Sequence, residues 1–309
     1  MYAWSSHPLL VLCAIFSLLQ LLVAYDIGKD VEPGPLGVLL DVSLARSWPL
    51  DNWPEDKGGR NSIPKRSWVF SSHLVFNQPT DRAHISDEQL TSIAIDAFKE
   101  MEQLWTPEGY DIGKEGRPSV MTALAYGNEI ILSSSQKGRV SFSYGDPQWQ
   151  NPSGAVGEGR PRANRVLNYL DLCEQMFLDR TIDIDRTEVR HRTGAKCGEE
   201  LAAHAYYRIH QDNDADLSNE HGRVTTVQRD LQSDQNLNKG IHAIDPCNTT
   251  PGEGKVEWGC AQFAREMNLT PLTLDVRESD RGPEYSYDLR NLAGGLNGDP
   301  RRIDICQRP

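Results

Sequence analysis

The stretch that decides the fold is SVMTALAYGNEIILS, residues 119–133. Two short runs rich in apolar and β-branched residues, 119–126 and 129–133, are separated by Gly127-Asn128. Such runs favour strands, and a two-residue link of this type is typical of a tight hairpin turn. The stretch therefore predicts two antiparallel strands joined by a hairpin.

Helices and further strands are predicted on both sides of this hairpin. Before it, residues 86–105 have a suitable N-cap in Ser86, and their apolar residues recur at helical spacing. After it, the sequence predicts helices over 163–178, 197–209 and 260–267, and strands over 223–228 and 272–276. This alternation favours a layered α/β arrangement in which helices cover a sheet.

The N-terminus carries the longest apolar run of the chain, residues 8–24, and a polar stretch follows it directly. The run is short for a spanning helix, and the small residue Ala24 fits a cleavage site. We expect a signal segment over 1–24 and a secreted mature chain with no membrane segment. An uncleaved N-terminal anchor is the alternative.

The charge of the chain limits its partners. It has 309 residues, with 32 Lys and Arg against 44 Asp and Glu, and a formal net charge of −12. Binding of duplex nucleic acid through its phosphates needs clustered basic residues, so this class of function is disfavoured.

The cysteines carry most of the functional information. Removal of the signal segment leaves an odd number of them: Cys173, Cys197, Cys247, Cys260 and Cys306. Secretion favours disulfides, so an odd number leaves either a free thiol or cysteines with another role. Three of the five occur in the segments Lys196-Cys197-Gly198-Glu199, Asp245-Pro246-Cys247 and Gly259-Cys260.

Two of these segments start predicted helices, which suits a hydrolytic zinc site. Zinc binds thiolates, and the positive end of a helix dipole favours a thiolate over a thiol. In a Cys-x-Glu pair at the first turn, both side chains can reach a ligand at the helix end. A carboxylate beside zinc-bound water can then transfer the proton of that water.

The order Cys-x-Glu, Pro-Cys and Cys resembles the signature of the zinc-dependent nucleobase and nucleoside deaminases. The hairpin at 121–138 is similar to the first two strands of that fold, and the strand 223–228 falls between the two motifs. The resemblance implies a three-layer helix-sheet-helix core of the cytidine deaminase type. It also implies Zn²⁺ bound by Cys197, Cys247 and Cys260, with Glu199 as the proton shuttle.

On this interpretation the chain divides into four parts. A signal segment over 1–24 and an irregular extension over 25–80 precede a deaminase-like domain over 81–276, and a tail follows over 277–309. The domain contains an insertion over about 136–192 with a helix of its own. Three zinc ligands would leave Cys173 and Cys306 to form one disulfide. The substrate would be a base or nucleoside rather than duplex nucleic acid, and the oligomeric state stays open.

The chain departs from the family pattern at two points. Twelve residues separate Cys247 from Cys260, where the family has two to four, and the first ligand is Cys rather than the commoner His. The alternative is that these cysteines form disulfides in a non-catalytic secreted interaction protein with a degenerate form of the same fold.

Two other groups near the third helix are interpreted as structural. Glu200 and His204 are four residues apart and are expected to form a surface hydrogen bond or a partly buried histidine. His191 and Arg192 are expected to lie in a solvated loop.

Overall fold

The computed structural model describes residues 29–41, 44, 68–137, 165–180, 190–191, 193–211, 214–229, 240–247, 250–252 and 255–303. The predicted signal segment and Cys306 lie outside these ranges. Within them, no helix is both long and apolar enough to cross a membrane.

The predicted hairpin is confirmed and lies within a seven-stranded mixed sheet. β3 (Val120–Tyr126) and β4 (Glu129–Ser134) pair antiparallel through a turn at Gly127, whose φ is +48°. The strand order is β1-β2-β4-β3-β6-β10, and β7 also pairs with β6. The remaining strands are β1 (Leu39–Leu40), β2 (Phe70–Val75), β6 (Arg223–Gln228), β7 (His242–Ile244) and β10 (Thr270–Pro271). β10 is parallel to β6, and the other pairs of this sheet are antiparallel.

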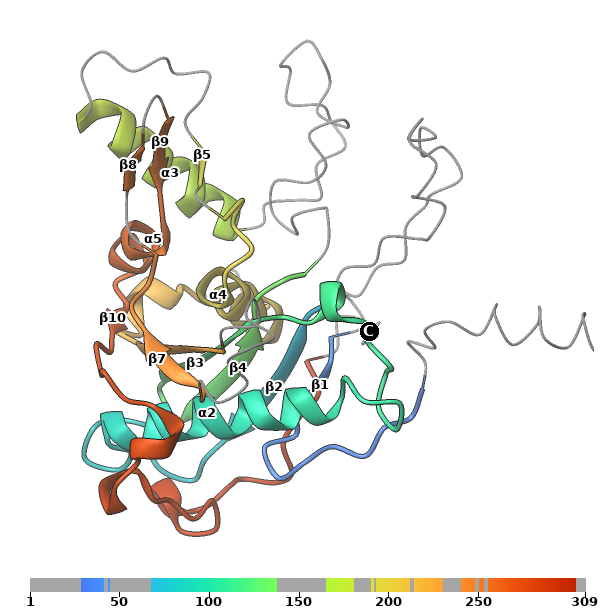
Figure 1. Cartoon of the computed structure of the whole chain (residues 1–309). Helices are drawn as coiled ribbons and strands as arrows, with labels where there is room; N and C mark the ends of the chain where they lie inside the picture. Colours follow the sequence, from blue (N-terminus) through green and yellow to red (C-terminus); the bar gives the residue numbers. More distant parts are fainter. Residues whose placement is uncertain are drawn as a thin grey trace, which may run out of the picture.

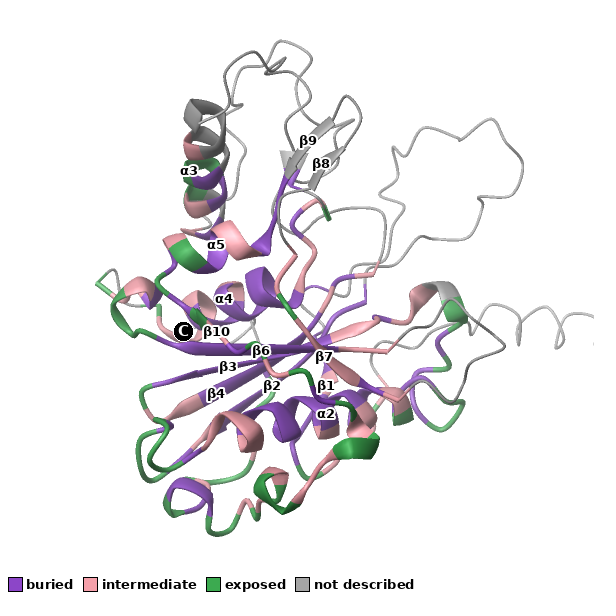
Figure 2. Cartoon of the chain, turned by 60° about the vertical axis from the view of Figure 1, so that its left-hand side comes forward, coloured by how far each residue is buried: buried purple, intermediate pink, exposed green. Residues whose placement is uncertain are grey.

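Helices lie on both faces of this sheet (Figures 1 and 2). Alternate residues of β3 point to opposite faces, as expected for a strand that is covered twice. Ala123 and Ala125 belong to the core under α2 (Asp87–Gln103), whereas Leu124 and Tyr126 belong to the core under α4 (Gly198–Ile209). α3 (Arg165–Arg180) and α5 (Cys260–Glu266) pack with α4 on the second face.

α2 begins where the sequence predicts. The Ser86 side chain accepts from the backbone N–H of Gln89, whose own side chain accepts from the Ser86 N–H, so two free donors of the first turn are satisfied. Asp87 in that turn pairs with the Arg223 guanidinium, which also donates to the carbonyl oxygens of Thr80 and Ile85. This buried arginine connects the start of α2 to β6.

Two parts of the sequence prediction are wrong. The predicted irregular extension over 25–80 contains β2, which pairs with β4 from Ser71 to Val75 and is buried along most of its length. The predicted strand over 272–276 is absent, since β10 is limited to Thr270–Pro271. β7 occupies the edge of β6 from Thr226 to Gln228, so β10 cannot continue along that edge.

The segment predicted as a tail is part of the same body through residue 303. Arg301 forms an antiparallel bridge with His73 of β2, and Leu296 forms one with Phe76. Leu292 and Ala293 are buried in the core under α2. The C-terminal segment therefore runs along the edge of β2 and adds to the main core.

A second, three-stranded sheet lies beside α3 and α5. Its order is β5 (Arg190–His191), β9 (Lys255–Trp258) and β8 (Thr250–Gly252), with β5 parallel to β9. Near this sheet, α3 carries the buried Cys173, and burial raises the pKa of its thiol to about 12. Because Cys306 lies outside the described residues, the predicted Cys173–Cys306 disulfide stays a prediction.

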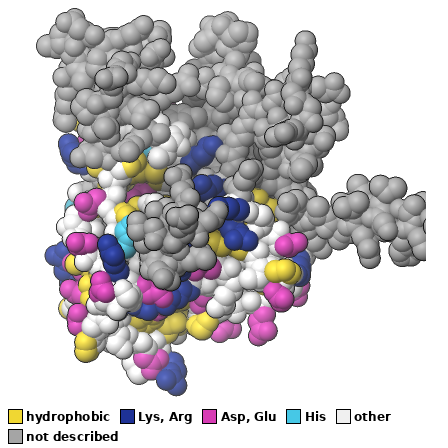
Figure 3. All heavy atoms as spheres, viewed as in Figure 1, with side chains coloured by type: hydrophobic (Ala, Val, Ile, Leu, Met, Phe, Trp, Pro, Cys, Tyr) yellow, Lys and Arg dark blue, Asp and Glu magenta, His cyan; other side chains and the backbone are white. Residues whose placement is uncertain are grey.

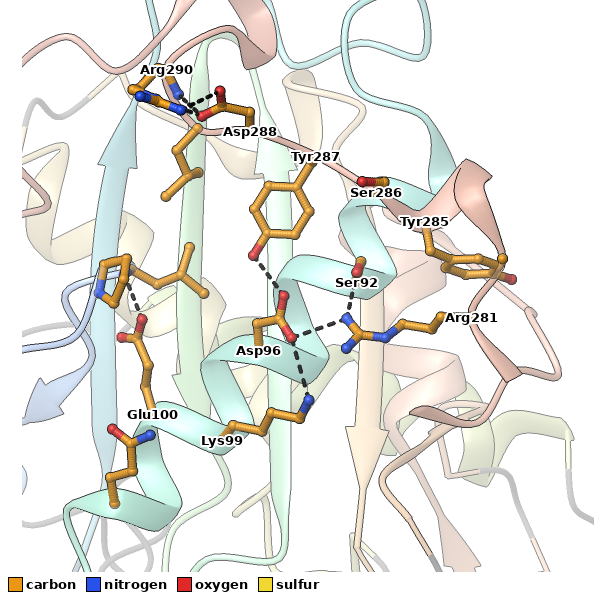
Figure 4. Close-up of a pocket in the computed structure, with 15 residues that line it drawn as sticks. Ser92, Asp96, Lys99, Glu100, Arg281, Tyr285, Ser286, Tyr287, Asp288 and Arg290 are labelled. Atoms are coloured by element: carbon orange, nitrogen blue, oxygen red, sulfur yellow. Dashed lines mark hydrogen bonds and ion pairs between the residues drawn. The ribbon is translucent and has the colours of Figure 1, made fainter. Parts of the chain in front are cut away.

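A groove of about 1120 Å³ lies on the outer side of α2 (Figure 4). At its centre, Asp96 accepts hydrogen bonds from Arg281 and from the Tyr287 hydroxyl, each at 3.0 Å, and Lys99 Nζ lies 3.8 Å from it. Arg281 also donates to Ser92 at 2.7 Å. These paired charges hold the C-terminal segment against α2.

Replacing Asp96 by alanine is expected to lower the free energy of unfolding by about 1–2 kcal/mol, since Arg281 and Tyr287 lose a shared, partly exposed acceptor. Urea unfolding would measure the loss. The matched change at exposed Asp214 is expected to leave the midpoint unchanged. Equal midpoints for the two variants would contradict the role given to Asp96.

On the molecular surface, basic and acidic side chains are interspersed over the described part of the face in Figure 3. The net charge of −12 is therefore not gathered into one acidic patch on that face.

Candidate metal centre

The first turn of α4 lies directly over the main sheet. Cys197 is the N-cap residue, and Glu199 and Glu200 follow within the first turn. A Cβ atom at Gly198 would collide with the Thr122 side chain and would lie 3.0 Å from the Ser133 carbonyl oxygen. Glycine at this position lets the helix approach β3 and β4 closely, which brings Cys197 and Glu199 onto the centre of the sheet.

Glu199 is buried and held by the strand beneath it. Its side chain accepts from the Thr226 hydroxyl at 2.9 Å, and Thr226 in turn contacts the Thr122 hydroxyl at 2.8 Å. Burial raises the pKa of Glu199 to about 7, and the charge of Glu200 acts in the same direction. A carboxyl group with a pKa near neutrality is suited to take up and release a proton at that pH.

Three cysteines meet above Glu199. The Sγ atoms of Cys247 and Cys260 are 3.1 Å apart, and the backbone N–H of Cys260 donates to Cys247 Sγ at 3.1 Å. The Cys197 thiol is in hydrogen-bonding contact with both. The four residues predicted from sequence to carry the chemistry thus lie together in the structure.

The twelve residues between Cys247 and Cys260 are explained by the small sheet. After Cys247 the chain enters β8, and it returns along β9 to Gly259. A Cβ atom at Gly259 would collide with the Cys247 carbonyl and lie 2.8 Å from its Sγ. Glycine therefore permits the close return, and the two cysteines become neighbours despite their separation in sequence.

The pKa values of Cys247 and Cys260 are shifted in opposite directions. Hydrogen bonds from Cys197 and Cys260 lower the pKa of the Cys247 thiol well below its usual value. The pKa of Cys260 is raised, chiefly by burial. A depressed thiol pKa at Cys247 favours its thiolate, the form of cysteine that binds metal ions.

His191 and Glu200 complete the group and were not predicted. His191 Nε2 lies 2.7 Å from Glu200 Oε1, and both side chains have no exposed area. Burial lowers the pKa of His191, but the charge and hydrogen bond of Glu200, together with the charges of Cys247 and Glu199, raise it above its usual value. The predictions of a solvated His191 and of a surface hydrogen bond between Glu200 and His204 are therefore wrong, because Glu200 points inward to His191. The other alternative for this pair, a partly buried His204, agrees with the structure.

The donor atoms form two overlapping groups in which all members lie within 4.8 Å of one another. One consists of His191, Cys247 and Cys260, and the other of Cys197, Glu199, Glu200 and Cys260. Their spacing is close enough to hold a metal ion. No family model, curated protein or solved structure matches the chain. Its function must therefore be inferred from this geometry.

The donor set can hold a metal ion, and its sulfur spacing can be compared with that of a zinc site. Two thiolates on one tetrahedral zinc lie about 3.8 Å apart, given Zn–S bonds of about 2.3 Å. The Cys247 and Cys260 sulfurs, 3.1 Å apart, are closer than this by about 0.7 Å and farther apart than bonded sulfurs, so binding an ion would require them to move slightly apart. Beside them, the buried Glu200 Oε2 has no hydrogen-bond partner among the described residues. An unsatisfied buried oxygen is expected where a bound group completes a site.

Proposed function

We propose that the protein is a secreted zinc-dependent hydrolytic deaminase that acts on a nucleobase, a nucleoside or a nucleic-acid base. The observation that carries this proposal is the convergence of Cys197, Cys247 and Cys260 beside the buried carboxyl group of Glu199. Secretion rests on the predicted signal segment over 1–24.

The order of elements supports a core of the cytidine deaminase type. The β3–β4 hairpin is followed by α4 with the Cys-x-Glu motif, then by β6, then by α5 with Cys260, and finally by β10 parallel to β6. This is the order that the sequence resemblance implies for the two motifs and the strand between them. The helices on both faces of the sheet agree with the proposed three-layer arrangement.

In the proposed reaction, an amino group on an amidine-like carbon is replaced by oxygen from water, and ammonia leaves. Cys197, Cys247 and Cys260 would hold a zinc ion, which would lower the pKa of a bound water from about 15.7 to about 7. Glu199 would take one proton from this water and pass it to the ring nitrogen as the oxygen adds to the carbon. It would then carry the remaining hydroxyl proton to the amino group, which leaves as ammonia while the carbonyl forms. Thr226 holds one carboxylate oxygen of Glu199, so the other is left for proton transfer.

The charge of the chain favours a small substrate. A net charge of −12 opposes binding of a long polynucleotide, and the described face in Figure 3 shows mixed rather than clustered basic residues. A free base or a nucleoside carries no phosphate and avoids this repulsion.

Metal analysis of the purified full chain tests the proposal first. We expect about one zinc per chain, lost in Cys197→Ser and Cys247→Ser and kept in Cys173→Ser, which alters a buried cysteine that belongs to neither donor group. The zinc-loaded protein should release ammonia from at least one base, nucleoside or single-stranded oligonucleotide in a panel of such compounds. Zinc without any ammonia release would reject the enzymatic proposal.

A second function is supported by the short Cys247–Cys260 separation. At 3.1 Å, a small movement would let these sulfurs form a disulfide in an oxidising compartment. The protein would then be a non-catalytic secreted interaction protein with a degenerate form of the fold. Metal-free protein with Cys247 and Cys260 joined, shown by mass spectrometry of peptides, would support this function and reject the deaminase.

Thr226 provides a finer test of the proposed role of Glu199. Thr226→Val removes the hydroxyl that holds the carboxyl group, and ammonia release is expected to fall roughly 10-fold. The matched control is Thr225→Val, because Thr225 faces α2 and contacts Thr91 instead. Initial rates measured at saturating zinc would check both, and equal rates for the two variants would contradict the role of Thr226.

A further inference from the structure

His191 is held in one orientation by the small sheet. As the last residue of β5, it lies opposite Trp258 of β9 in a parallel register. Its ring stands edge-on to the Trp258 ring, with centroids 4.7 Å apart and an angle of 90°. The side chain is fully buried, so each ring nitrogen has a fixed neighbour.

Nδ1 of His191 faces two backbone groups that can only donate a hydrogen bond and cannot accept one. The backbone N–H groups of Thr193 and Ala195 point to it, with N···N distances of 3.2 and 3.0 Å. Gly194 and Ala195 both have positive φ, +64° and +52°, and this turn directs the two N–H groups at the ring. A backbone N–H can only donate, so Nδ1 must be the acceptor.

The proton of the ring is therefore on the other nitrogen. A neutral imidazole has one donor and one acceptor nitrogen, so Nε2 of His191 carries the hydrogen. Nε2 donates to Glu200 Oε1 at 2.7 Å and lies 3.7 Å from Cys260 Sγ. A metal ligand needs a free lone pair, which a protonated Nε2 does not have. Ligation through Nε2 would move the proton to Nδ1, against the two N–H groups of the turn.

We propose that His191 is a positioning residue and not a metal ligand: its Nε2–H holds Glu200 beside Cys260 and leaves the three cysteines as the protein ligands. The identity of those ligands rests on the proposed function, but the position of the His191 proton does not. Glu200 Oε1 lies 3.4 Å from Cys260 Sγ, so the pair connects the first turn of α4 to the first residue of α5. Through His191, the segment inserted before α4 fixes the spacing of the two helix starts that carry Cys197 and Cys260.

Nitrogen-15 NMR of the histidine rings in the full chain tests this directly. In metal-free, reduced protein, we expect Nδ1 of His191 to be unprotonated and Nε2 to be protonated. After loading with cadmium-113, we expect the same pattern and no coupling between cadmium and the His191 ring. A proton on Nδ1 or a cadmium–Nε2 coupling would overturn the proposal. If the protein binds no metal, the proposed function fails, while the metal-free spectrum still decides the position of the proton.

Two substitutions separate positioning from ligation. His191→Gln keeps an N–H donor near the position of Nε2, whereas His191→Asn keeps an acceptor for the turn and removes that donor. With cobalt(II) as the probe, His191→Gln should keep the full sulfur-to-cobalt absorption, whereas Cys260→Ser should lose about one third of it. His191→Asn should weaken cobalt binding about 10–100-fold without removing a sulfur ligand. A ligand-field spectrum altered by His191→Gln as strongly as by Cys260→Ser would overturn the proposal.

Discussion

Glu199→Gln is expected to lower ammonia release from the accepted base by about 10²–10⁴-fold while the protein keeps its zinc. Glutamine has the same shape and can still accept from the Thr226 hydroxyl, so the first turn of α4 should stay in place. It cannot take up a proton. The loss should therefore fall on the chemical step, and steady-state rates together with zinc content would measure it.

The control for this variant is Glu284→Gln, which changes a carboxyl group in a short helical turn far from the sulfur group. It should keep both zinc and the full rate. If Glu199→Gln keeps the full rate, another group transfers the proton and the proposed mechanism is wrong. If Glu199→Gln loses its zinc, Glu199 is a metal ligand rather than the proton shuttle. The donor group that contains Glu199 together with Cys197 and Cys260 is close enough for that role.

The second large effect is expected from the buried His191–Glu200 pair. Either His191→Leu or Glu200→Leu should lower the free energy of unfolding by about 3–5 kcal/mol, because each leaves its buried partner without a counterpart. The double variant should lose much less than the sum of the two single losses, since it leaves neither group unpaired. Urea unfolding in the presence of a chelator and a reductant would measure the four proteins without any contribution from metal binding.

An exposed ion pair provides the comparison for these His191 and Glu200 variants. Arg290 and Asp288 lie 3.1 Å apart at the surface, and Arg290→Ala is expected to leave the unfolding midpoint unchanged. Additive losses in the His191 and Glu200 variants would show that the two side chains contribute independently. That result would contradict the claim that the interaction between His191 and Glu200 stabilises the protein.

Local patterns in the sequence were sufficient for most of the elements that position the site. The Gly127-Asn128 turn, the Ser86 cap and the apolar spacing of 86–105 are each determined by neighbours in sequence, and the structure agrees with all three. β2 was missed because a single strand within a long stretch rich in Pro and Gly has little local signal. It is stabilised instead by pairing with β4 and by the bridge to Arg301.

Some residues of the candidate site could likewise be predicted from local sequence, and others could not. The three cysteines and Glu199 could be selected from their order and from the predicted helix starts. His191 could not, because its role depends on a two-residue strand that pairs with β9, about 67 residues later in the chain. Glu200 was paired with His204 because of their four-residue spacing, a rule that describes neighbours on one helix and gives no information about contacts with β5.

The separate three-stranded sheet has a consequence for how fast a bound ion would exchange with solvent. β5, β8 and β9 share no strand with the seven-stranded sheet, yet they carry His191 and lead directly into Cys260. Proteins open in cooperative units smaller than the whole, and a short sheet with few pairings is such a unit. The rate of ion release should then be similar to the rate of amide hydrogen exchange in β5 and β9. It should be much higher than the rate of exchange in β3 and β4. The residence time of the ion would be set by this small sheet, while the large sheet stays folded.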